Sequence, residues 1–275
     1  MLRNMMVKLE RDGGTLAVEV SGAGPLVVCV PEMGESRASF RHLAPGLVEA
    51  GYTVAVMDLR GHGDSSASFD SYDDVAAAGD VLAIIDAHGD GPATIVGNSM
   101  GAAAAVLAAA ERPEAAVRLV LIGPFVRDHG PAAGRLLMRL LLARPWGPAV
   151  WRGYYGSLFG RQRPADHDEH VSRALALLSR PGRWRTFQET TRTSHAAAEA
   201  ALPRVRTDAL VVMGDQDRDF AGPEAEARWV AEALHGEHRM IPGAGHYPMG
   251  EQPAEVLSVV LPFLRGAGSQ DASHG

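Results

Sequence analysis

The sequence predicts an α/β fold in which helices flank a mostly parallel sheet. Short apolar, β-branched runs alternate with helical patterns along most of the chain, and the later runs are apolar at nearly every position, as expected for strands buried on both faces. The alternation stops over residues 125–206, where helical patterns occur without a clear strand. These observations predict a core domain of residues 1–124 and 207–265, with a helical cap of residues 125–206 inserted between two strands.

Eight runs are predicted to form strands, and helices connect most of them. The first two runs flank a glycine-rich turn at residues 12–14 and are typical of a hairpin, because glycine tolerates a positive φ. The helical patterns between the later strands imply right-handed crossovers between parallel strands. The predicted strands are 7–10, 15–20, 26–30, 52–58, 93–98, 118–123, 209–214 and 238–242; the predicted core helices are 37–50, 72–88, 100–111, 224–235 and 252–265, and the cap has helical patterns at 134–144 and 169–180.

The composition of the 275-residue chain excludes several classes of protein. Its 26 basic and 33 acidic residues give a net charge of −7, whereas a nucleic-acid-binding protein usually carries a basic stripe and a high pI. No apolar run reaches the roughly 18 residues of a membrane span, and the first residues lack the apolar segment of a signal peptide. Because Cys29 is the one cysteine, no intrachain disulfide can form, and we expect a cytoplasmic protein with neither nucleic acid nor membrane as a partner. The small, polar residues 266–275 are expected to form a disordered tail.

The charge is unevenly distributed along the chain. The cap segment 125–206 holds 14 arginines and 6 acidic residues, for a net charge of +8, while the remainder holds 12 basic and 27 acidic residues, for −15. One interpretation is that the cap arginines lie on the outer surface and that their attraction to the acidic core helps the cap to dock. The alternative is that some of them face the pocket and select an anionic substrate.

The GNSMG sequence at residues 97–101 fits the pattern G-x-S-x-G of a nucleophile elbow. It directly follows the predicted strand 93–98 and precedes an alanine-rich helix, which is the setting in which a sharp turn lifts a serine hydroxyl above the sheet. Glycines at both ends of the pattern leave room for the tight backbone. Ser99 is therefore the candidate nucleophile, and the alternative is a glycine-serine turn that only caps the helix.

Two further residues complete a candidate triad with Ser99. His246 follows the last predicted strand, at the carboxyl edge where ligands of open α/β sheets bind, and is the candidate base for a serine that is otherwise a poor nucleophile. Asp217 follows the strand 209–214 and is the candidate carboxylate that orients the imidazole. The chain order serine, aspartate, histidine is the order expected for an elbow serine on an α/β sheet.

Other residues compete for the same two roles. His62, in a glycine-rich loop after the strand 52–58, is the second candidate for the base, although a structural role in that loop is favoured. Asp215 lies closer to the strand end than Asp217 and is expected to cap the turn, while Asp219 lies farther out. Asp128, which follows the preceding strand, is the principal rival to Asp217 as the triad acid.

Four motifs lie in order on the expected elements: DLRGHGDS at 58–65, GNSMG at 97–101, GDQD at 214–217 and GAGHYP at 243–248. Together they resemble the motifs of the α/β-hydrolase fold superfamily, and the resemblance covers nearly the whole chain. It implies a mostly parallel sheet of eight strands and a triad of Ser99, Asp217 and His246. It also implies that the segment 125–206 is the helical cap that covers the active site in many members.

The resemblance further implies an oxyanion hole formed by the backbone N–H groups of Met100 and Met33. Many members carry a His-Gly pair in the loop of the second donor, whereas this chain has Pro31 and Glu32 there. An ionised carboxylate aimed at the oxyanion would oppose its stabilisation. The alternatives are that Glu32 points outward into solvent, that it is protonated, or that it serves as an acid/base group or binds a substrate hydroxyl or ammonium.

These residues predict a serine hydrolase without cofactor or metal, which cleaves a small ester, thioester or lactone through an acyl-enzyme. The first alternative is an enzyme of secondary metabolism on the same scaffold, a C–C hydrolase, cyclase or isomerase that uses Glu32 as an extra acid/base group. The second is a non-catalytic ligand-binding protein. Ser99 disfavours epoxide hydrolase and haloalkane dehalogenase chemistry, because members with those activities carry aspartate at the elbow. The histidines, including His167 and His170, lack the paired spacing of metal ligands. The sequence also lacks a dinucleotide-binding fingerprint.

A small-molecule substrate is the expected partner, and the cap is expected to line much of its pocket. Aromatic residues near or within the cap are the candidates for this lining, although they fit the cap's own core equally well. They are Phe125, Trp146, Trp151, Tyr154, Tyr155 and Trp184.

Overall fold

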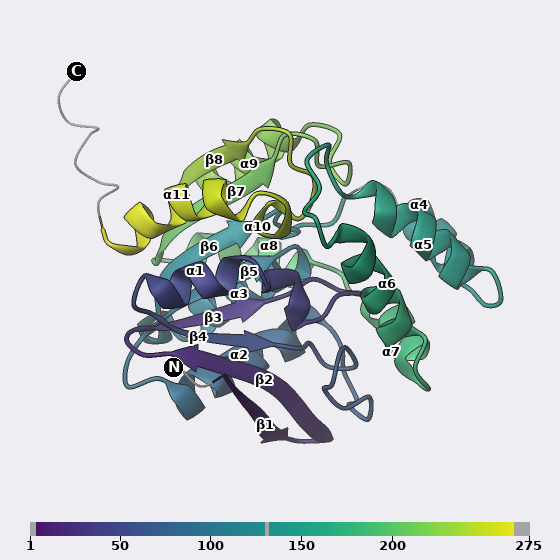
Figure 1. The fold of residues 1–275 in the computed structure, drawn as a ribbon, viewed down its shortest axis with the longest axis horizontal. Helices are drawn as coiled ribbons and strands as arrows, with labels where there is room; N and C mark the ends of the chain where they lie inside the picture. Colours follow the sequence, from purple (N-terminus) through teal and green to yellow (C-terminus); the bar gives the residue numbers. More distant parts are fainter. Residues whose placement is uncertain (1–3, 130–131, 267–275) are drawn as a thin grey trace.

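The computed structural model of this chain describes residues 4–129 and 132–266, the first five of the latter by their backbone only. An eight-stranded sheet forms its centre, with the strand order β1-β2-β4-β3-β5-β6-β7-β8 (Figure 1). β2 pairs antiparallel with β1 and with β4, and the remaining neighbours pair in parallel, so the predicted α/β fold with a mostly parallel sheet is confirmed. The strands are β1 (Met5–Arg11), β2 (Gly14–Gly22), β3 (Leu26–Val30), β4 (Thr53–Met57), β5 (Ala93–Asn98), β6 (Ala116–Ile122), β7 (Asp208–Gly214) and β8 (Glu237–Ile241).

Helices cover both faces of this sheet, because successive side chains of each strand point to opposite sides. Val27 and Cys29 of β3 belong to the core beneath α1 (Leu43–Glu49) and α11 (Pro253–Leu264). Val28 and Val30 belong to the core on the other face, with the remaining large helices. Those helices are α2 (Asp74–His88), α3 (Met100–Glu111) and α9 (Pro223–Ala233), and Figure 1 shows the two layers on either side of the strands.

The predicted elements agree closely with the observed ones, and β3, β5 and α3 have the predicted bounds. One predicted helix is divided, since the stretch 37–50 forms a short 3-10 helix, η1 (Arg37–Phe40), before α1. The predicted helix 252–265 is α11, and a short helix that was not predicted, α10 (Pro248–Glu251), precedes it. Pro253 begins α11, because the first turn of a helix tolerates the missing N–H of proline.

Four helices between β6 and β7 extend beyond the carboxyl edge of the sheet, as Figure 1 shows, where the sequence predicts a helical cap. They are α4 (Ala132–Leu141), α5 (Gly147–Ser157), α6 (His167–Leu178) and α7 (Arg183–Thr190). The next helix, α8 (Ala196–Ala201), packs on α2 and α3 of the core instead. The predicted domain boundaries stay predictions, and residues 267–275 of the predicted disordered tail lie outside the described residues.

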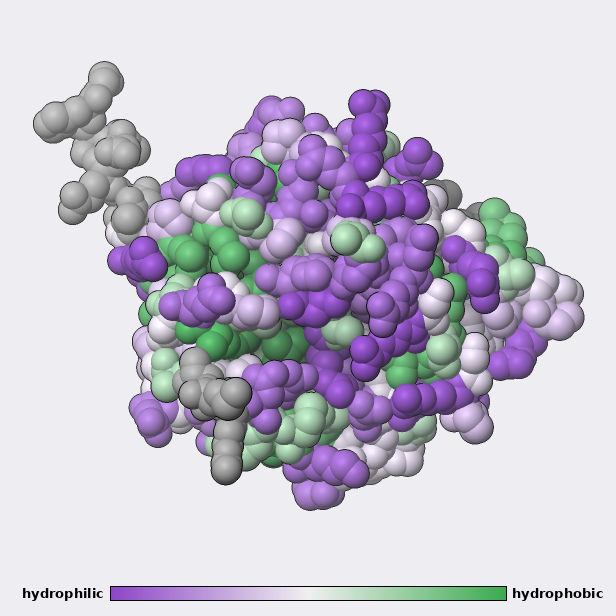
Figure 2. Space-filling view, in the orientation of Figure 1, coloured by the Kyte–Doolittle hydropathy of each residue, from purple (hydrophilic) through white to green (hydrophobic). Residues whose placement is uncertain are grey.

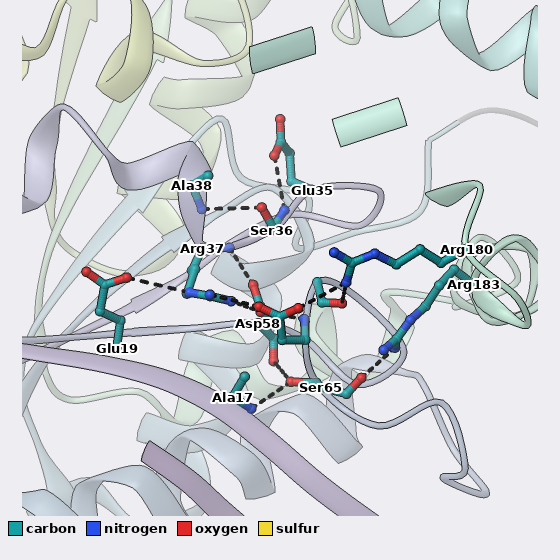
Figure 3. A network of polar contacts seen from close by, with 12 residues as sticks. Ala17, Glu19, Glu35, Ser36, Arg37, Ala38, Asp58, Ser65, Arg180 and Arg183 are labelled. Carbon is teal, nitrogen blue, oxygen red and sulfur yellow. Dashed lines mark hydrogen bonds and ion pairs between the residues drawn. The ribbon is translucent and has the colours of Figure 1, made fainter. Parts of the chain in front are cut away.

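The motif of residues 58–65 is a structural loop built around Asp58 (Figure 3). The Asp58 carboxylate accepts hydrogen bonds from the backbone N–H groups of Arg37 at 2.7 Å and Asp64 at 2.8 Å, and it pairs with the Arg37 guanidinium. Ser65 Oγ donates to the Asp58 carbonyl at 2.8 Å. A Cβ at Gly63 would overlap the Asp58 carboxylate, so this close approach requires glycine.

Arginines of the cap reach this loop and the core (Figure 3). Arg180 Nη1 lies 3.0 Å from Asp64 Oδ1, Arg183 donates to a carbonyl of the same loop, and Arg127 Nε lies 3.0 Å from Glu226 Oε1. No cap arginine whose side chain is described makes a hydrogen bond or ion pair with the candidate triad. These contacts favour the docking interpretation for Arg127, Arg180 and Arg183, and the selection of an anionic substrate by cap arginines stays a prediction.

Figure 2 shows a mostly hydrophilic face, with hydrophobic side chains gathered on the left, around α1 and α11, and at the far end of the cap on the right. Leu137 and Leu140 of α4 and Trp146 just before α5 are each more than half exposed. Within the described part of the chain, no helix is both long and apolar enough to cross a lipid bilayer.

Candidate active site

Ser99 lies on the sharp turn between β5 and α3. Its backbone has φ of +55° and ψ of −117°, a conformation that costs energy for any residue with a side chain. The Ser99 N–H donates to the Ile122 carbonyl at 2.9 Å, which ties the turn to β6. A Cβ at Gly97 would overlap the backbone of Gly101, and one at Gly101 would overlap the carbonyl of Val30. Both glycines of the motif are therefore required by the close backbone approach, as the sequence predicts.

His246 and Asp217 meet at the carboxyl edge of the sheet. His246 Nδ1 lies 2.7 Å from Asp217 Oδ2, and both side chains are buried. Asp217 follows β7 and His246 follows β8, so the ends of neighbouring strands bring them together. Asn98, the residue before Ser99, donates from Nδ2 to the His246 carbonyl at 3.3 Å. The three candidate triad residues are thus brought to one buried site, where Ser99 is 5% exposed.

The competing residues lie elsewhere and have other partners. Asp128 accepts hydrogen bonds from Ser194 Oγ at 2.7 Å and from the His195 backbone at 2.9 Å, and so holds the end of the cap segment. Asp215 accepts from the Gly243 N–H at 2.7 Å, as expected for a residue that caps the turn. His62 is buried with Nδ1 2.9 Å from the Arg60 carbonyl, and burial lowers its pKa to about 4. A neutral histidine that bonds its own loop fits a structural role.

Glu32 points into this site. Its side chain is buried, Oε2 lies 3.1 Å from His246 Nε2, and the Tyr247 hydroxyl donates a hydrogen bond to Oε1. The interpretation of Glu32 as an outward, solvated side chain is therefore wrong. The Glu32 carboxylate approaches Nε2 closely without the alignment of a hydrogen bond, so buried Nε2 has no hydrogen-bond partner. Among the hydrogen bonds of the described residues, none joins Nε2 to Ser99.

Asp219 is a second carboxylate beside the imidazole, although the sequence places it far out on the loop. Asp219 Oδ2 lies 3.7 Å from His246 Nε2, and the Tyr154 hydroxyl donates to Oδ1. The Asp219 backbone N–H donates to Asp217 Oδ1 at 3.0 Å, so the loop folds back on itself and carries Asp219 inward. The imidazole therefore has Asp217 on one side and two further carboxylates, Glu32 and Asp219, on the other.

This environment changes the protonation of the site. Burial alone lowers the pKa of His246, but the charges of Asp217 and Asp219 outweigh burial and hold the pKa well above its usual value near 6.5. Burial raises the pKa of Glu32 to about 7, although the nearby charge of His246 acts in the opposite direction. Burial also raises the pKa of Asp219. The surrounding carboxylates therefore favour the protonated form of His246 more than in an ordinary histidine.

A second buried cluster lies on the loop that carries the predicted oxyanion donor Met33. The Glu35 carboxylate accepts a hydrogen bond from the Tyr155 hydroxyl of α5, and its Oε1 lies 2.8 Å from His170 Nε2 of α6. Two cap helices thus hold this loop next to the amino end of α3, where the N–H of Met100, the other predicted donor, is free of helical partners. His170 lies on α6, which corresponds to the predicted helical pattern at 169–180.

The predicted pocket aromatics separate into three groups. Phe125 and Tyr154 reach the site: the Phe125 ring centroid lies 6.0 Å from that of His246, and Tyr154 binds Asp219. Tyr155 is buried against Glu35, while Trp151 and Trp184 pack on Phe187 within the cap. Trp146 is exposed and donates to the Leu140 carbonyl. Sequence reasoning missed Phe220 and Tyr247, whose rings also lie beside His246.

Asp217, Asp219 and His246 form one group of potential cation ligands in the described part of the chain, with ligand atoms within 4.8 Å of one another. The sequence predicts no metal, since the histidines lack paired spacing. Two members of the group are the acid and base candidates of the triad, so a metal there would compete with the proton transfer that the triad performs.

An eight-stranded α/β sheet with a serine on the strained turn after β5 and a histidine–aspartate pair after β8 and β7 defines a class of proteins, the α/β hydrolases. The chain belongs to the alpha/beta hydrolase family, whose model matches residues 27–259. The prediction of an α/β-hydrolase enzyme is thereby confirmed at the level of the family.

Individual relatives have several different activities. The chain is 34% identical over 162 residues to epoxide hydrolase B of Mycobacterium tuberculosis, a match that covers 58% of this chain but 38% of that protein. It is 36% identical over 263 residues to the sn-1-specific diacylglycerol lipase ABHD11 of Mus musculus, covering 87% of this chain and 81% of the relative. The crystal structure of a bromoperoxidase from Bacillus anthracis has a TM-score of 0.82 at 20% identity and covers 96% of this chain and 100% of its own, which supports the fold alone.

Proposed function

We propose that this protein is a serine hydrolase that cleaves a small ester, thioester or lactone through an acyl-enzyme on Ser99. The observation that carries the proposal is the 2.7 Å contact of His246 Nδ1 with Asp217, at the sheet edge where the elbow presents Ser99. The mouse relative is named as a diacylglycerol lipase, an enzyme of ester hydrolysis, and it matches most of the chain.

The reaction begins when neutral His246 takes the proton of Ser99 Oγ on Nε2 as the hydroxyl attacks the substrate carbonyl. Asp217 holds the imidazole tautomer and stabilises the imidazolium through Nδ1. The N–H groups of Met33 and Met100 donate hydrogen bonds to the developing oxyanion. His246 then protonates the leaving group, and in the second half it activates water to release the acid and restore Ser99.

Glu32 must move away from Nε2 for these steps to proceed, because Nε2 lies 3.1 Å from that carboxylate and makes no hydrogen bond with Ser99. A rotation of either the Glu32 or the His246 side chain lets Nε2 leave Glu32 and bind Ser99 Oγ. Elbow geometry in a free enzyme often tightens only when substrate is bound. The proposal therefore places Glu32 next to the proton-transfer path and not in the oxyanion hole itself.

The test is the hydrolysis of 4-nitrophenyl acetate by the wild-type protein and by Ser99→Ala. We expect kcat to fall by about 10⁶-fold in the variant, the effect of removing a triad nucleophile. A fluorophosphonate probe should label the wild-type protein on Ser99, as read by peptide mass spectrometry. An unchanged rate in Ser99→Ala, with circular dichroism showing a folded variant, would contradict the mechanism.

A second candidate function is favoured by the inward position of Glu32. A buried carboxyl with a pKa raised to about 7 and an oxygen 3.1 Å from His246 Nε2 is suited to move a proton at neutral pH. That arrangement would serve an enzyme of the same fold that acts on C–C bonds or catalyses cyclisation or isomerisation. Rapid labelling of Ser99 by the fluorophosphonate without turnover of simple esters would favour this candidate over the first.

A further inference from the structure

Two carboxylates outside the predicted triad converge on one atom. Glu32 Oε2 lies 3.1 Å and Asp219 Oδ2 3.7 Å from His246 Nε2. Glu32 comes from the loop after β3 and Asp219 from the loop after β7, so separate parts of the sheet edge bring them to the same place. The catalytic steps proposed above need neither of these side chains.

A tyrosine anchors each carboxylate by its other oxygen. The Tyr247 hydroxyl donates to Glu32 Oε1, and the Tyr154 hydroxyl donates to Asp219 Oδ1. Each carboxylate is therefore held at one oxygen, with the second turned toward the imidazole. The two free oxygens form a preorganised pair of acceptors beside the point where the substrate carbonyl must lie.

The negative charge of this pair is not balanced by a basic side chain. Among the arginines and lysines whose side chains are described, none forms an ion pair with Glu32 or Asp219, and Arg180 and Arg127 of the cap bind the core elsewhere. His129 lies nearby, but its Nε2 contacts Glu226 at 3.5 Å. A single imidazolium thus faces three carboxylates, and buried charges without a counterion are costly.

The nitrogen on which the two carboxylates converge also points to a ligand. His246 Nε2 is fully buried and lacks a hydrogen-bond partner, which is rare for a buried polar atom. It needs an acceptor such as a leaving-group oxygen, while the carboxylate oxygens beside it need a donor. A molecule that offers both groups next to its carbonyl would satisfy every one of these atoms.

We propose that the substrate carries a protonated amine on its acyl part, close to the scissile carbonyl, and that this ammonium binds between Glu32 and Asp219. We assign the amine to the acyl side because Glu32 directly precedes Met33, the predicted oxyanion donor, on the loop after β3. This inference rests on the proposed serine hydrolase function and gives its substrate class, the esters or thioesters of short amino acids.

Ammonium binding would also prepare the base. The negative charges around His246 hold its pKa high, and a bound cation offsets them, so the pKa falls toward the usual range and Nε2 loses its proton. The cation also favours ionised Glu32, which then turns to the ammonium and away from Nε2. A substrate without the amine would leave His246 protonated and slow to accept the Ser99 proton.

The experiment compares two esters of the same size, 4-nitrophenyl glycinate and 4-nitrophenyl propionate, at pH 7, with each rate divided by its uncatalysed hydrolysis. We expect the normalised kcat/KM of the wild-type protein to be at least about tenfold higher for the glycinate. Glu32→Gln and Asp219→Asn should each lower this ratio about fivefold or more. The matched control is Glu237→Gln, because Glu237 lies on β8 and pairs with Arg239. This variant should keep the wild-type ratio of the two rates.

A second readout separates recognition of the amine from a general effect on folding or basicity. The acidic limb of the pH profile of kcat, which reports the enzyme–substrate complex, should lie at lower pH for the glycinate than for the propionate in the wild-type protein, and this difference should shrink in Glu32→Gln. A variant that merely folds poorly would lower the rates for both esters together. It would leave the ratio of the two rates and the acidic limbs of the two pH profiles unchanged.

Three results would overturn the inference. Equal normalised rates for the two esters, with both hydrolysed through Ser99, would remove it and leave the hydrolase proposal standing. An unaltered ratio in both variants would show that these carboxylates do not bind the amine. Activity that is lost with EDTA and restored by Zn²⁺ would assign Asp217, Asp219 and His246 to a metal instead. Failure of Ser99 labelling and of all ester turnover would instead reject the proposed function itself.

Discussion

Two buried acidic regions of this protein differ in how their charge is balanced. In and around the loop of residues 58–65, Asp58 pairs with Arg37, and the fully buried Asp80 of α2 pairs with Arg60 at 2.6 Å and with Arg11 at 3.0 Å. At the candidate active site, the partners of Glu32 and Asp219 among the described side chains are tyrosine hydroxyls and one shared imidazole. The first region has a guanidinium for each carboxylate, and the second has an excess of carboxylates.

The difference separates structural from functional burial of charge. A buried carboxylate with a bidentate or doubly bonded arginine is satisfied by the fold itself and has no need of a ligand. A buried carboxylate that lacks such a partner raises the free energy of the folded state, and such costs are typically retained at functional sites. We therefore expect substitutions in the first region to change stability and those in the second to change activity.

The largest effect on stability is expected for Arg37→Met. This change leaves the Asp58 charge buried without its guanidinium, and removal of one partner from a buried pair costs about 3 kcal/mol in free energy of unfolding. Urea denaturation at pH 7 measures the loss, with Arg228→Met as the control, since Arg228 forms an exposed pair with Glu224. A loss below about 1 kcal/mol would show that the Asp58–Arg37 pair does not stabilise the fold, and it would contradict the distinction between structural and functional burial of charge.

A smaller effect of opposite sign is expected for Glu32→Gln at pH 8. Burial raises the Glu32 pKa from 4.5 to about 7, so the folded state binds more protons than the unfolded state between these values. Stability contributed by the protonated carboxyl is therefore lost as pH rises through this window. The neutral amide removes that loss, and we expect unfolding free energy at pH 8 to be unchanged or up to about 1 kcal/mol higher.

The same denaturation experiment at pH 5 provides the control for Glu32→Gln, because wild-type Glu32 is protonated there and the two proteins should then be of similar stability. A variant that is clearly less stable than the wild type at pH 8 would mean that ionised Glu32 is as well balanced as Asp58, and the comparison would fail.

The smallest effect is expected for Arg180→Met at the edge of the cap. Arg180 and Asp64 are each about half exposed, so their ion pair contributes at most about 0.5 kcal/mol and is screened by salt. The free energy of unfolding should fall by no more than this at low ionic strength and be indistinguishable from wild type in 1 M NaCl. A larger loss that persists in salt would mean that cap docking depends on this arginine through packing.

Most of the fold and the candidate triad could be predicted from the sequence because they depend on local patterns. Apolar runs indicate strands buried on both faces, and the glycines around Ser99 indicate a strained turn at a strand end. Asp217 and His246 each lie just beyond a predicted strand, and the parallel sheet brings neighbouring strand ends together. Their positions in the chain were therefore sufficient to predict their proximity.

The remaining site residues depend on packing between distant segments. Glu32 and Tyr247 are separated by more than two hundred positions, and no local signal indicates which way the Glu32 side chain turns. Asp219 is carried inward by a loop that bends around Asp217, a turn that spacing alone does not show. The contact of Glu35 with His170 requires the cap to be in place, and an acidic flanking sequence gives no hint that the histidine is buried.

The most direct test of the central claim is the rate of Ser99 labelling by a fluorophosphonate as a function of pH, in the wild-type protein and in Glu32→Gln. Labelling requires neutral His246, whose pKa the surrounding carboxylates hold well above 6.5, so the wild-type rate should rise with a midpoint above that value. Removing the Glu32 charge should move the midpoint to lower pH. An identical midpoint in both proteins, or labelling at a residue other than Ser99, would contradict the account.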